Sequence, residues 1–156
     1  MYRLRVVSDI HHDTLRLERL VPIINTSGYF VCCGDGVNDF LRVRGELTVP
    51  TVCVRGNNDF YTDIGDEAVI TIGETRALVV HGHRHGAKRG VDLLVAAAKS
   101  RECGLVFFGH SHCYCDRVVD GVHLINPGAL CNGSYAEVIG DGRTFKCKQG
   151  FVDMFD

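Results

Sequence analysis

Five separate apolar segments of this chain are each followed, close to their carboxyl ends, by side chains of the kinds that bind metal ions. The segments span residues 4–7, 29–33, 51–54, 77–80 and 105–108. Each is a short apolar run bounded by polar or glycine residues, which predicts a β-strand. They are followed by Asp9-Ile10-His11, Gly34-Asp35, Gly56-Asn57-Asn58-Asp59, His81-Gly82-His83 and Gly109-His110-Ser111-His112. Ligands of open α/β sheets bind beyond the carboxyl ends of the strands, so the fold must gather these strand ends in one place.

Several of the intervening segments have the apolar spacing of short amphipathic helices. The residues expected to face inward are Leu17, Leu20, Val21 and Ile24 in the first helix, Val37, Phe40 and Leu41 in the second, and Val91, Leu94, Val95 and Ala98 in the third. Either Asp13 or Thr14 can cap the first helix.

The last third of the chain has the pattern of β-hairpins. Asp-Gly pairs at 120–121 and 141–142 separate apolar segments, and this dipeptide supplies the positive φ angles of a type I′ turn. The tail from Phe151 to Asp156 is expected to pack loosely. A chain that begins with β-α units and ends with hairpins fits a mixed sheet, or two sheets face to face with helices outside.

Size and composition narrow the class of protein. A length of 156 residues predicts one domain, spanning 1–156. The net charge of −2 argues against strong non-specific binding to nucleic acid or to an anionic membrane surface. The amino terminus lacks the apolar region of a secretory signal, and no apolar stretch is long enough to span a bilayer. We therefore expect a cytoplasmic protein whose eight cysteines are reduced thiols.

Seven donors in the pattern are candidates for metal ligands: Asp9, His11, Asp35, Asn57, His81, His110 and His112. Mixed carboxylate, amide and imidazole ligands suit first-row ions such as Mn, Fe or Zn. Seven donors exceed what one ion needs once water is counted, so we expect two ions about 3.5–4 Å apart. Asp35 lies between the other donors in the sequence and is the candidate bridging ligand.

The charge of such a centre favours a phosphate substrate. Two divalent ions carry four positive charges, of which Asp9 and Asp35 offset two, while the other donors are neutral. The remaining charge can hold a hydroxide and a phosphodiester monoanion. A water that bridges the two ions would have a pKa far below that of bulk water. It would be the nucleophile, so no serine or cysteine nucleophile is required.

The order of the motifs resembles a known family. Along the chain they are Asp9-x-His11, Gly34-Asp35-x3-Asp39, Gly56-Asn57-x-Asp59, His81-Gly82-His83 and Gly109-His110-x-His112. This order resembles the calcineurin-like metallophosphoesterase superfamily, and in particular its small prokaryotic phosphodiesterase branch, which is related to the scaffold subunit of the retromer coat. The segment Asn126-Pro127-Gly128 is typical of the same branch.

The resemblance implies an α/β fold, an αββα sandwich of two mixed β-sheets flanked by helices, which is the metallo-dependent phosphatase fold. It implies one ion bound by Asp9, His11, Asp35 and His112, and a second bound by Asp35, Asn57, His81 and His110. Asp39 and Asp59 would orient these ligands. The two divalent ions are expected to be Mn²⁺, with Zn²⁺, Fe²⁺ and Ni²⁺ as alternatives. The expected reaction is hydrolysis of a small phosphodiester by a hydroxide that bridges the ions.

Position 58 departs from the family pattern. The wider superfamily has a histidine there, able to protonate the leaving group, and this branch often has cysteine. Asn58 can donate a hydrogen bond but is no general acid at neutral pH, so esters with poor leaving groups should react slowly. His83 is the best remaining candidate to contact the phosphate or supply a proton. The candidate catalytic residues besides the metal ligands are therefore Asn58, His83, Asp39 and Asp59.

Other functions are compatible with the sequence. A phosphomonoesterase or a nuclease could use the same fold, although the slightly acidic chain makes nucleic acid an unfavoured partner. A non-catalytic scaffold or binding module is a further alternative because a fold does not fix activity, but the complete set of metal ligands favours an enzyme. An exposed sheet edge would support a homodimer.

His123 is expected to be a hydrogen-bonded structural residue, and Asn126-Pro127-Gly128 could be a simple turn.

Overall fold

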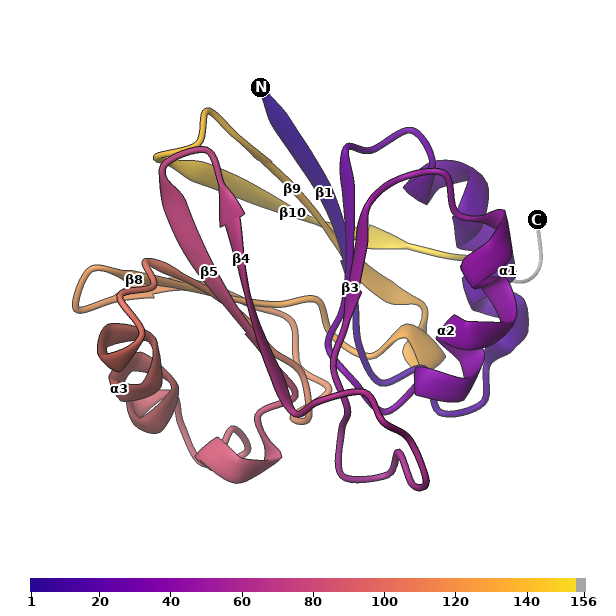
Figure 1. The fold of residues 1–156 in the computed structure, drawn as a ribbon, viewed down its shortest axis with the longest axis horizontal. Coiled ribbons are helices and arrows are strands. Elements are labelled where there is room, and N and C mark those ends of the chain that lie inside the picture. Colours follow the sequence, from indigo (N-terminus) through magenta and orange to yellow (C-terminus); the bar gives the residue numbers. More distant parts are fainter. Residues whose placement is uncertain (154–156) are drawn as a thin grey trace.

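Two five-stranded β-sheets lie face to face, with helices on their outer sides (Figure 1). The computed structural model describes residues 1–153. In spatial order, the first sheet contains β10 (Phe145–Phe151), β9 (Ser134–Gly140), β1 (Tyr2–Val7), β2 (Tyr29–Cys32) and β3 (Thr51–Cys53). The second contains β4 (Glu67–Ile72), β5 (Thr75–Val80), β6 (Leu105–Phe107), β8 (Val122–Asn126) and β7 (Cys115–Val119). The expected αββα sandwich of two mixed sheets is confirmed.

Each sheet combines three parallel strands with two that are joined by antiparallel pairing, which lie together on one side of the first sheet and at the two edges of the second. Strands β1, β2 and β3 are parallel to one another, as are β5, β6 and β8. Antiparallel pairs attach β9 and β10 to the first sheet, and β4 and β7 to the second. Parallel strands are covered on both faces, which explains why their sequences are nearly continuous apolar runs.

Successive residues of these strands pack into different layers because side chains alternate across a sheet. Leu4 and Val6 of β1 face the opposite sheet, whereas Val7 packs with the helices on the outer side. Likewise, Leu105 and Phe107 of β6 lie between the sheets, and Val106 packs against a helix. The apolar core therefore has three layers, and the central layer joins the two sheets.

Three α-helices cover the outer faces of the sheets (Figure 1). Helices α1 (Thr14–Ile24) and α2 (Val37–Val43) pack on the first sheet, and α3 (Asp92–Ser100) packs on the second. Asp13 is the N-cap of α1, as expected, because its side chain accepts a hydrogen bond from the backbone of Arg16. No helix within residues 1–153 has the length and the apolar character needed to cross a bilayer.

Two expectations about side-chain placement were wrong. Leu41 is 45% exposed, and Val43 is buried in its place. Helix α2 is only seven residues long, so its inner face follows the spacing of Val37, Phe40 and Val43. The tail was expected to pack loosely from Phe151, but Phe151 is paired with Ser134 as the last residue of β10. The rest of that expectation, from 154 onward, lies outside the described residues.

Leucine-to-alanine substitutions at two sites test the central layer. Leu105 is fully buried between the sheets, whereas Leu93 on α3 is 59% exposed. Leu105→Ala should lower the free energy of unfolding by about 2–5 kcal/mol because it removes buried contacts and leaves a cavity. The matched variant Leu93→Ala should change it by less than about 0.5 kcal/mol. Urea denaturation measures both values, and equal effects would contradict this arrangement of layers.

Candidate metal centre

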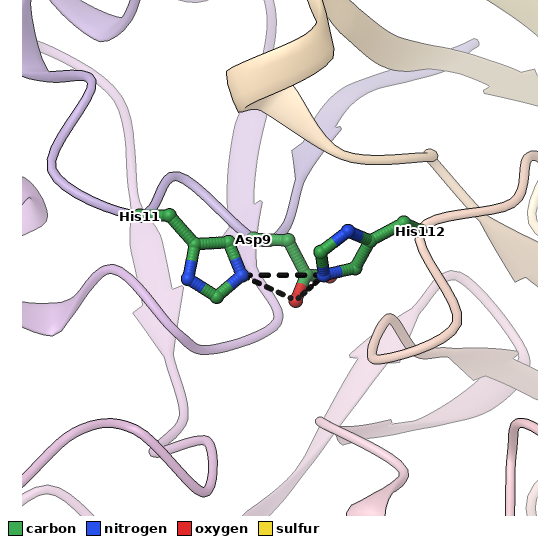
Figure 2. Close-up of side chains that lie close together, drawn as sticks. All are labelled: Asp9, His11 and His112. Carbon is green, nitrogen blue, oxygen red and sulfur yellow. Dashed lines mark hydrogen bonds and ion pairs between the residues drawn. The ribbon is translucent and has the colours of Figure 1, made fainter.

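Asp9, His11 and His112 form a compact group at one edge of the sandwich (Figure 2). Asp9 and His11 follow β1, and His112 follows β6 of the other sheet. The carboxylate oxygen Oδ1 of Asp9 lies 3.3 Å from Nε2 of His11 and 3.2 Å from Nε2 of His112. The two Nε2 atoms lie 3.2 Å apart. Asp9 is fully buried, whereas the two imidazoles are partly exposed. Solvent therefore reaches the group from the side of the imidazoles and not from the side of the carboxylate.

A second group lies next to the first and shares Asp9. It contains Asp9, Asp35 and His81, all buried. Nε2 of His81 lies 3.2 Å from Oδ2 of Asp35 and 3.8 Å from Oδ1 of Asp9. Nδ1 of His110 lies 3.3 Å from the same nitrogen of His81. His11 also approaches Oδ2 of Asp35, at 3.7 Å, so each carboxylate touches imidazoles of both groups, and a bridging role for Asp35 stays a prediction.

The buried groups are oriented by hydrogen bonds that leave specific atoms free. Oδ2 of Asp9 accepts hydrogen bonds from Ser8 Oγ at 2.8 Å and from the His110 backbone at 3.0 Å. Nδ1 of His81 lies 2.8 Å from the Cys33 carbonyl. A carbonyl only accepts, so Nδ1 carries a proton and Nε2 is the nitrogen that can bind a metal. In the described chain, Oδ1 of Asp9 is buried and accepts no hydrogen bond.

Most of the donors are held in an uncommon backbone conformation. Positive φ angles occur at Asp9, His11, Asp35, His110 and His112, with values of 45° to 69°. This conformation is sparsely populated by residues other than glycine, although Asp and His adopt it more readily than most. It costs about 1–3 kcal/mol for each residue and is typical of functional sites. The donors themselves therefore take part in the sharp turns after the strands, together with Gly34 and Gly82, which also have positive φ angles.

Two glycines beside the donors supply space. A Cβ atom on Gly56 would lie 2.2 Å from Oδ1 of Asp35. One on Gly109 would lie 1.9 Å from Ser8 Oγ and 2.7 Å from Oδ2 of Asp9. Both distances are far below van der Waals contact, so any larger residue would displace the carboxylates. These glycines are required because the loops approach the carboxylates closely.

Charges in the centre shift the pKa values of its groups. Burial alone would raise the pKa of Asp35, but the hydrogen bond and charge of His81 and the hydrogen bonds of Asn58 outweigh it, so the pKa is well below its usual range. Burial likewise disfavours the charged form of His81, yet the hydrogen bond with Asp35 and the charges of both aspartates raise its pKa. Burial, followed by the charge of His81, lowers the pKa of His110.

The donors fit a bound divalent cation. Oδ1 of Asp9 is buried and accepts no hydrogen bond, although Nε2 of His11 and of His112 face it at 3.3 and 3.2 Å; burying such an atom is costly unless a cation or a donor faces it. Nε2 of His11 lies 3.2 Å from Nε2 of His112, and Nδ1 of His110 lies 3.3 Å from Nε2 of His81. At such distances the two nitrogens of each pair can share at most one proton. Carboxylates and imidazoles together are ligands that suit first-row divalent ions.

Six of the seven predicted metal ligands are brought together, and a ligand role for the seventh, Asn57, stays a prediction. The six are Asp9, His11, Asp35, His81, His110 and His112. The side chain of Asn57 is exposed and lines an adjoining groove. Within residues 1–153 it makes no hydrogen bond with any of the six.

The other candidate residues surround the ligands. Asn58 donates hydrogen bonds to both oxygens of Asp35. Asp59 accepts hydrogen bonds from the backbone of Asp35, Val37 and Gly56. The ring of His83 lies 5.5 Å from that of His81 and 6.2 Å from that of His110. Burial, followed by the charges of His81 and Arg84, lowers the pKa of His83.

Asp39 supports the loop that carries His11. Its buried carboxylate accepts hydrogen bonds from the backbone of His12, at 3.3 Å, and from the hydroxyl of Thr14. Asp39 thus lies where a residue that orients the loop is expected.

Asn126 is a supporting residue whose importance the sequence analysis understated. It is fully buried at the end of β8, and its amide donates to the Gly109 carbonyl at 3.1 Å and to Ser111 Oγ at 3.0 Å. It therefore braces the loop that carries His110 and His112. The Asn-Pro-Gly motif was the available signal, but it was also compatible with a simple turn. His123, in contrast, pairs with Asp116 at 2.6 Å, as expected of a structural residue.

Comparisons with known proteins agree with this fold and site. The family model described as "Calcineurin-like phosphoesterase superfamily domain" matches residues 2–142. The chain is 37% identical over 126 residues to "Probable metallophosphoesterase YsnB" of Bacillus subtilis, covering 80% of this chain and 73% of that protein. It is 27% identical over 146 residues to "Phosphodiesterase MJ0936" of Methanocaldococcus jannaschii, covering 83% and 84%.

Solved structures show the same fold. A predicted phosphoesterase from Streptococcus pneumoniae has a TM-score of 0.83 at 25% identity, covering 97% of this chain and 90% of that chain. Vps29 of Entamoeba histolytica, in complex with zinc, has a TM-score of 0.71 at 20% identity, covering 97% and 99%. At that identity the likeness to Vps29 shows the fold alone.

The chain belongs to the calcineurin-like phosphoesterase superfamily. The resemblance inferred from the motifs is thereby confirmed, including the likeness to the small prokaryotic branch and to Vps29-type proteins. The family is metal-dependent, and the two groups described above are this chain's candidate metal-binding residues.

Removing one imidazole tests the metal centre. His112→Ala should weaken Mn²⁺ binding at least about tenfold, because orienting residues alone contribute 10–100-fold to metal affinity. His123→Ala is the matched control, since His123 pairs with Asp116 away from the centre. Isothermal titration of metal-free protein with Mn²⁺ measures both. Equal affinities of the two variants would show that His112 binds no ion.

Proposed function

We propose that this protein is a metal-dependent phosphodiesterase that hydrolyses small phosphate diesters at a centre of two divalent ions. The observation that carries the proposal is the pair of buried carboxylates, Asp9 and Asp35, surrounded by imidazoles from both sheets. The family and the relative named as a phosphodiesterase support the reaction class.

The residues divide into two overlapping ligand sets. Asp9, His11 and His112 would hold one ion, and Asp35, His81 and His110 the other, with Asp35 as the proposed bridge. When bound, a pair of divalent ions neutralises phosphate charge and lowers the pKa of water, so that a nucleophile is available at neutral pH. Mn²⁺ is the proposed ion, with Zn²⁺, Fe²⁺ and Ni²⁺ as alternatives.

The chain's own groups orient the substrate and the ligands. His11 and His112 are partly exposed at the mouth of the centre, so an ester can approach from that side. His83 lies behind His81 and His110 and has a lowered pKa. Its imidazole is placed to donate a hydrogen bond to a phosphate oxygen of the bound ester.

A groove beside the centre favours a diester over a monoester. Its volume is about 400 Å³, and its lining includes Asn57, Phe60, Tyr61, His83 and Arg84. A diester carries a second organic substituent, and the groove provides room for it next to His83. Phe60 and Tyr61 offer exposed aromatic faces, and Arg84 offers a guanidinium that is only partly engaged by Asp66.

The remaining expectations concern location and partners. We propose a cytoplasmic protein that acts on small phosphate esters, without a membrane or nucleic-acid partner. A homodimer through an outer strand is part of the same proposal, because β3, β4, β7 and β10 are the sheet edges. A scaffold of the Vps29 type is the competing function. The six assembled ligands favour the enzyme, since binding to a partner protein does not require them.

Hydrolysis of bis(p-nitrophenyl) phosphate tests the activity. Mn²⁺-loaded protein should release p-nitrophenol, and His81→Ala should lower kcat/KM at least about 100-fold because a buried metal ligand is lost. His123→Ala serves as the control. Circular dichroism verifies that the variants are folded. Equal rates before and after chelation with EDTA would contradict a metal-dependent reaction, and no hydrolysis with any of the four metals would favour the scaffold.

The dependence on the leaving group tests the absence of a general acid at position 58. Across a series of aryl methyl phosphates, kcat/KM should fall steeply as the pKa of the leaving phenol rises, because unassisted departure leaves negative charge on its oxygen. The slope of log(kcat/KM) against leaving-group pKa is the measured quantity. A flat plot under saturating Mn²⁺ would show that another residue, with His83 as the first candidate, supplies the proton.

A further inference from the structure

Asn58 occupies both oxygens of the Asp35 carboxylate. Its backbone N–H donates to Oδ1 at 2.9 Å, and its side-chain Nδ2 donates to Oδ2 at 2.9 Å. Oδ2 is also the oxygen that faces Nε2 of His81 at 3.2 Å and Nε2 of His11 at 3.7 Å. The amide that stands where the family has a proton donor is therefore engaged by the carboxylate of a candidate metal ligand.

The neighbouring Asp59 fixes the main chain of the same loop. Its carboxylate accepts from the backbone of Asp35 at 2.7 Å, of Gly56 at 2.9 Å and of Val37 at 3.0 Å. Asp35 itself has a φ of 55°, so its backbone depends on these bonds to remain in a sparsely populated region. Asp59 thus holds the peptide of Asp35, while Asn58 holds its side chain.

We propose that Asn58 is a positioning residue for Asp35, which keeps the carboxylate turned toward His81 and His11 so that it can bind both ions, and that Asn58 does not contact the leaving group. The proposal deepens the proposed function and rests on it only for the part that concerns substrate. A carboxylate oxygen accepts in two directions, so a bond from Nδ2 leaves Oδ2 a second direction for a cation.

The geometry disfavours the alternative role, in which the amide turns toward substrate. Turning Nδ2 away would remove a donor from Oδ2, which lies in a buried carboxylate. A hydrogen bond to a charged carboxylate is stronger than one between neutral groups, so its loss is unfavourable. A leaving-group contact at this position would therefore compete directly with the orientation of Asp35.

The first arm of the test is Mn²⁺ affinity, which does not depend on turnover. Asn58→Ala removes the Nδ2 bond and keeps the backbone bond to Oδ1, so Mn²⁺ should bind about tenfold more weakly in isothermal titration of metal-free protein. Asn25→Ala is the matched control, because the side chain of Asn25 forms its hydrogen bonds with the backbone of Glu46 and Thr48, away from the centre; it should alter the affinity less than twofold. Unchanged affinity of Asn58→Ala in folded protein would overturn the proposal.

The second arm is the leaving-group plot. If Asn58 positions Asp35, Asn58→Ala lowers kcat/KM of all aryl methyl phosphates by a common factor, and the plot keeps its slope. If Asn58 instead contacts the leaving group, the loss grows with the pKa of the phenol, and a steeper slope would overturn the proposal. Wild-type protein that binds Mn²⁺ but hydrolyses no ester would refute the proposed function, while the titration would still decide the role of Asn58.

Discussion

Two buried carboxylates close to each other are the constraint on which this structure depends. The ligand atoms of Asp9, Asp35 and His81 all lie within 4.8 Å of one another, and like charges at such distances repel strongly in a poorly solvated site. His81 is the imidazole that responds to both carboxylates: burial disfavours its charged form, but the hydrogen bond with Asp35 and the charges of both aspartates raise its pKa. A proton on Nε2 of His81 and a metal ion would therefore compete for the same position beside the carboxylates, so binding of a metal is coupled to release of a proton.

Much of the surrounding structure maintains this arrangement. The strained donors persist because hydrogen bonds from outside their own loops fix them, such as those of Asp59 to the backbone of Asp35 and of Asn126 to the loop after β6. Gly56 and Gly109 give the carboxylates space that no side chain could share. The sheets supply the rigid strands from which these loops start.

The sequence predicted the parts of the fold that follow from periodicity and from local chemistry. Apolar runs gave the parallel strands, the Asp-Gly pair at 120–121 gave a turn with positive φ at both residues, and polar residues after the strands gave six assembled ligands. It could not predict contacts that depend on the three-dimensional path of the loops. The engagement of Asn58 with Asp35 and the bracing by Asn126 are of this kind. The wrong prediction for Leu41 arose because a two-turn helix leaves two apolar positions, 41 and 43, to compete for one inner face.

The donors are divided equally between the two layers of the sandwich. Asp9, His11 and Asp35 follow strands of the first sheet, and His81, His110 and His112 follow strands of the second. Each group of ligands therefore exists only while the layers keep their mutual alignment, and an ion held by both would resist shear between them. A change in the packing of Leu105 or Phe107, in the strand that leads to His110 and His112, can reach the chemistry by tilting one layer against the other. Metal affinity in this protein is thus also a measure of how its two sheets are aligned.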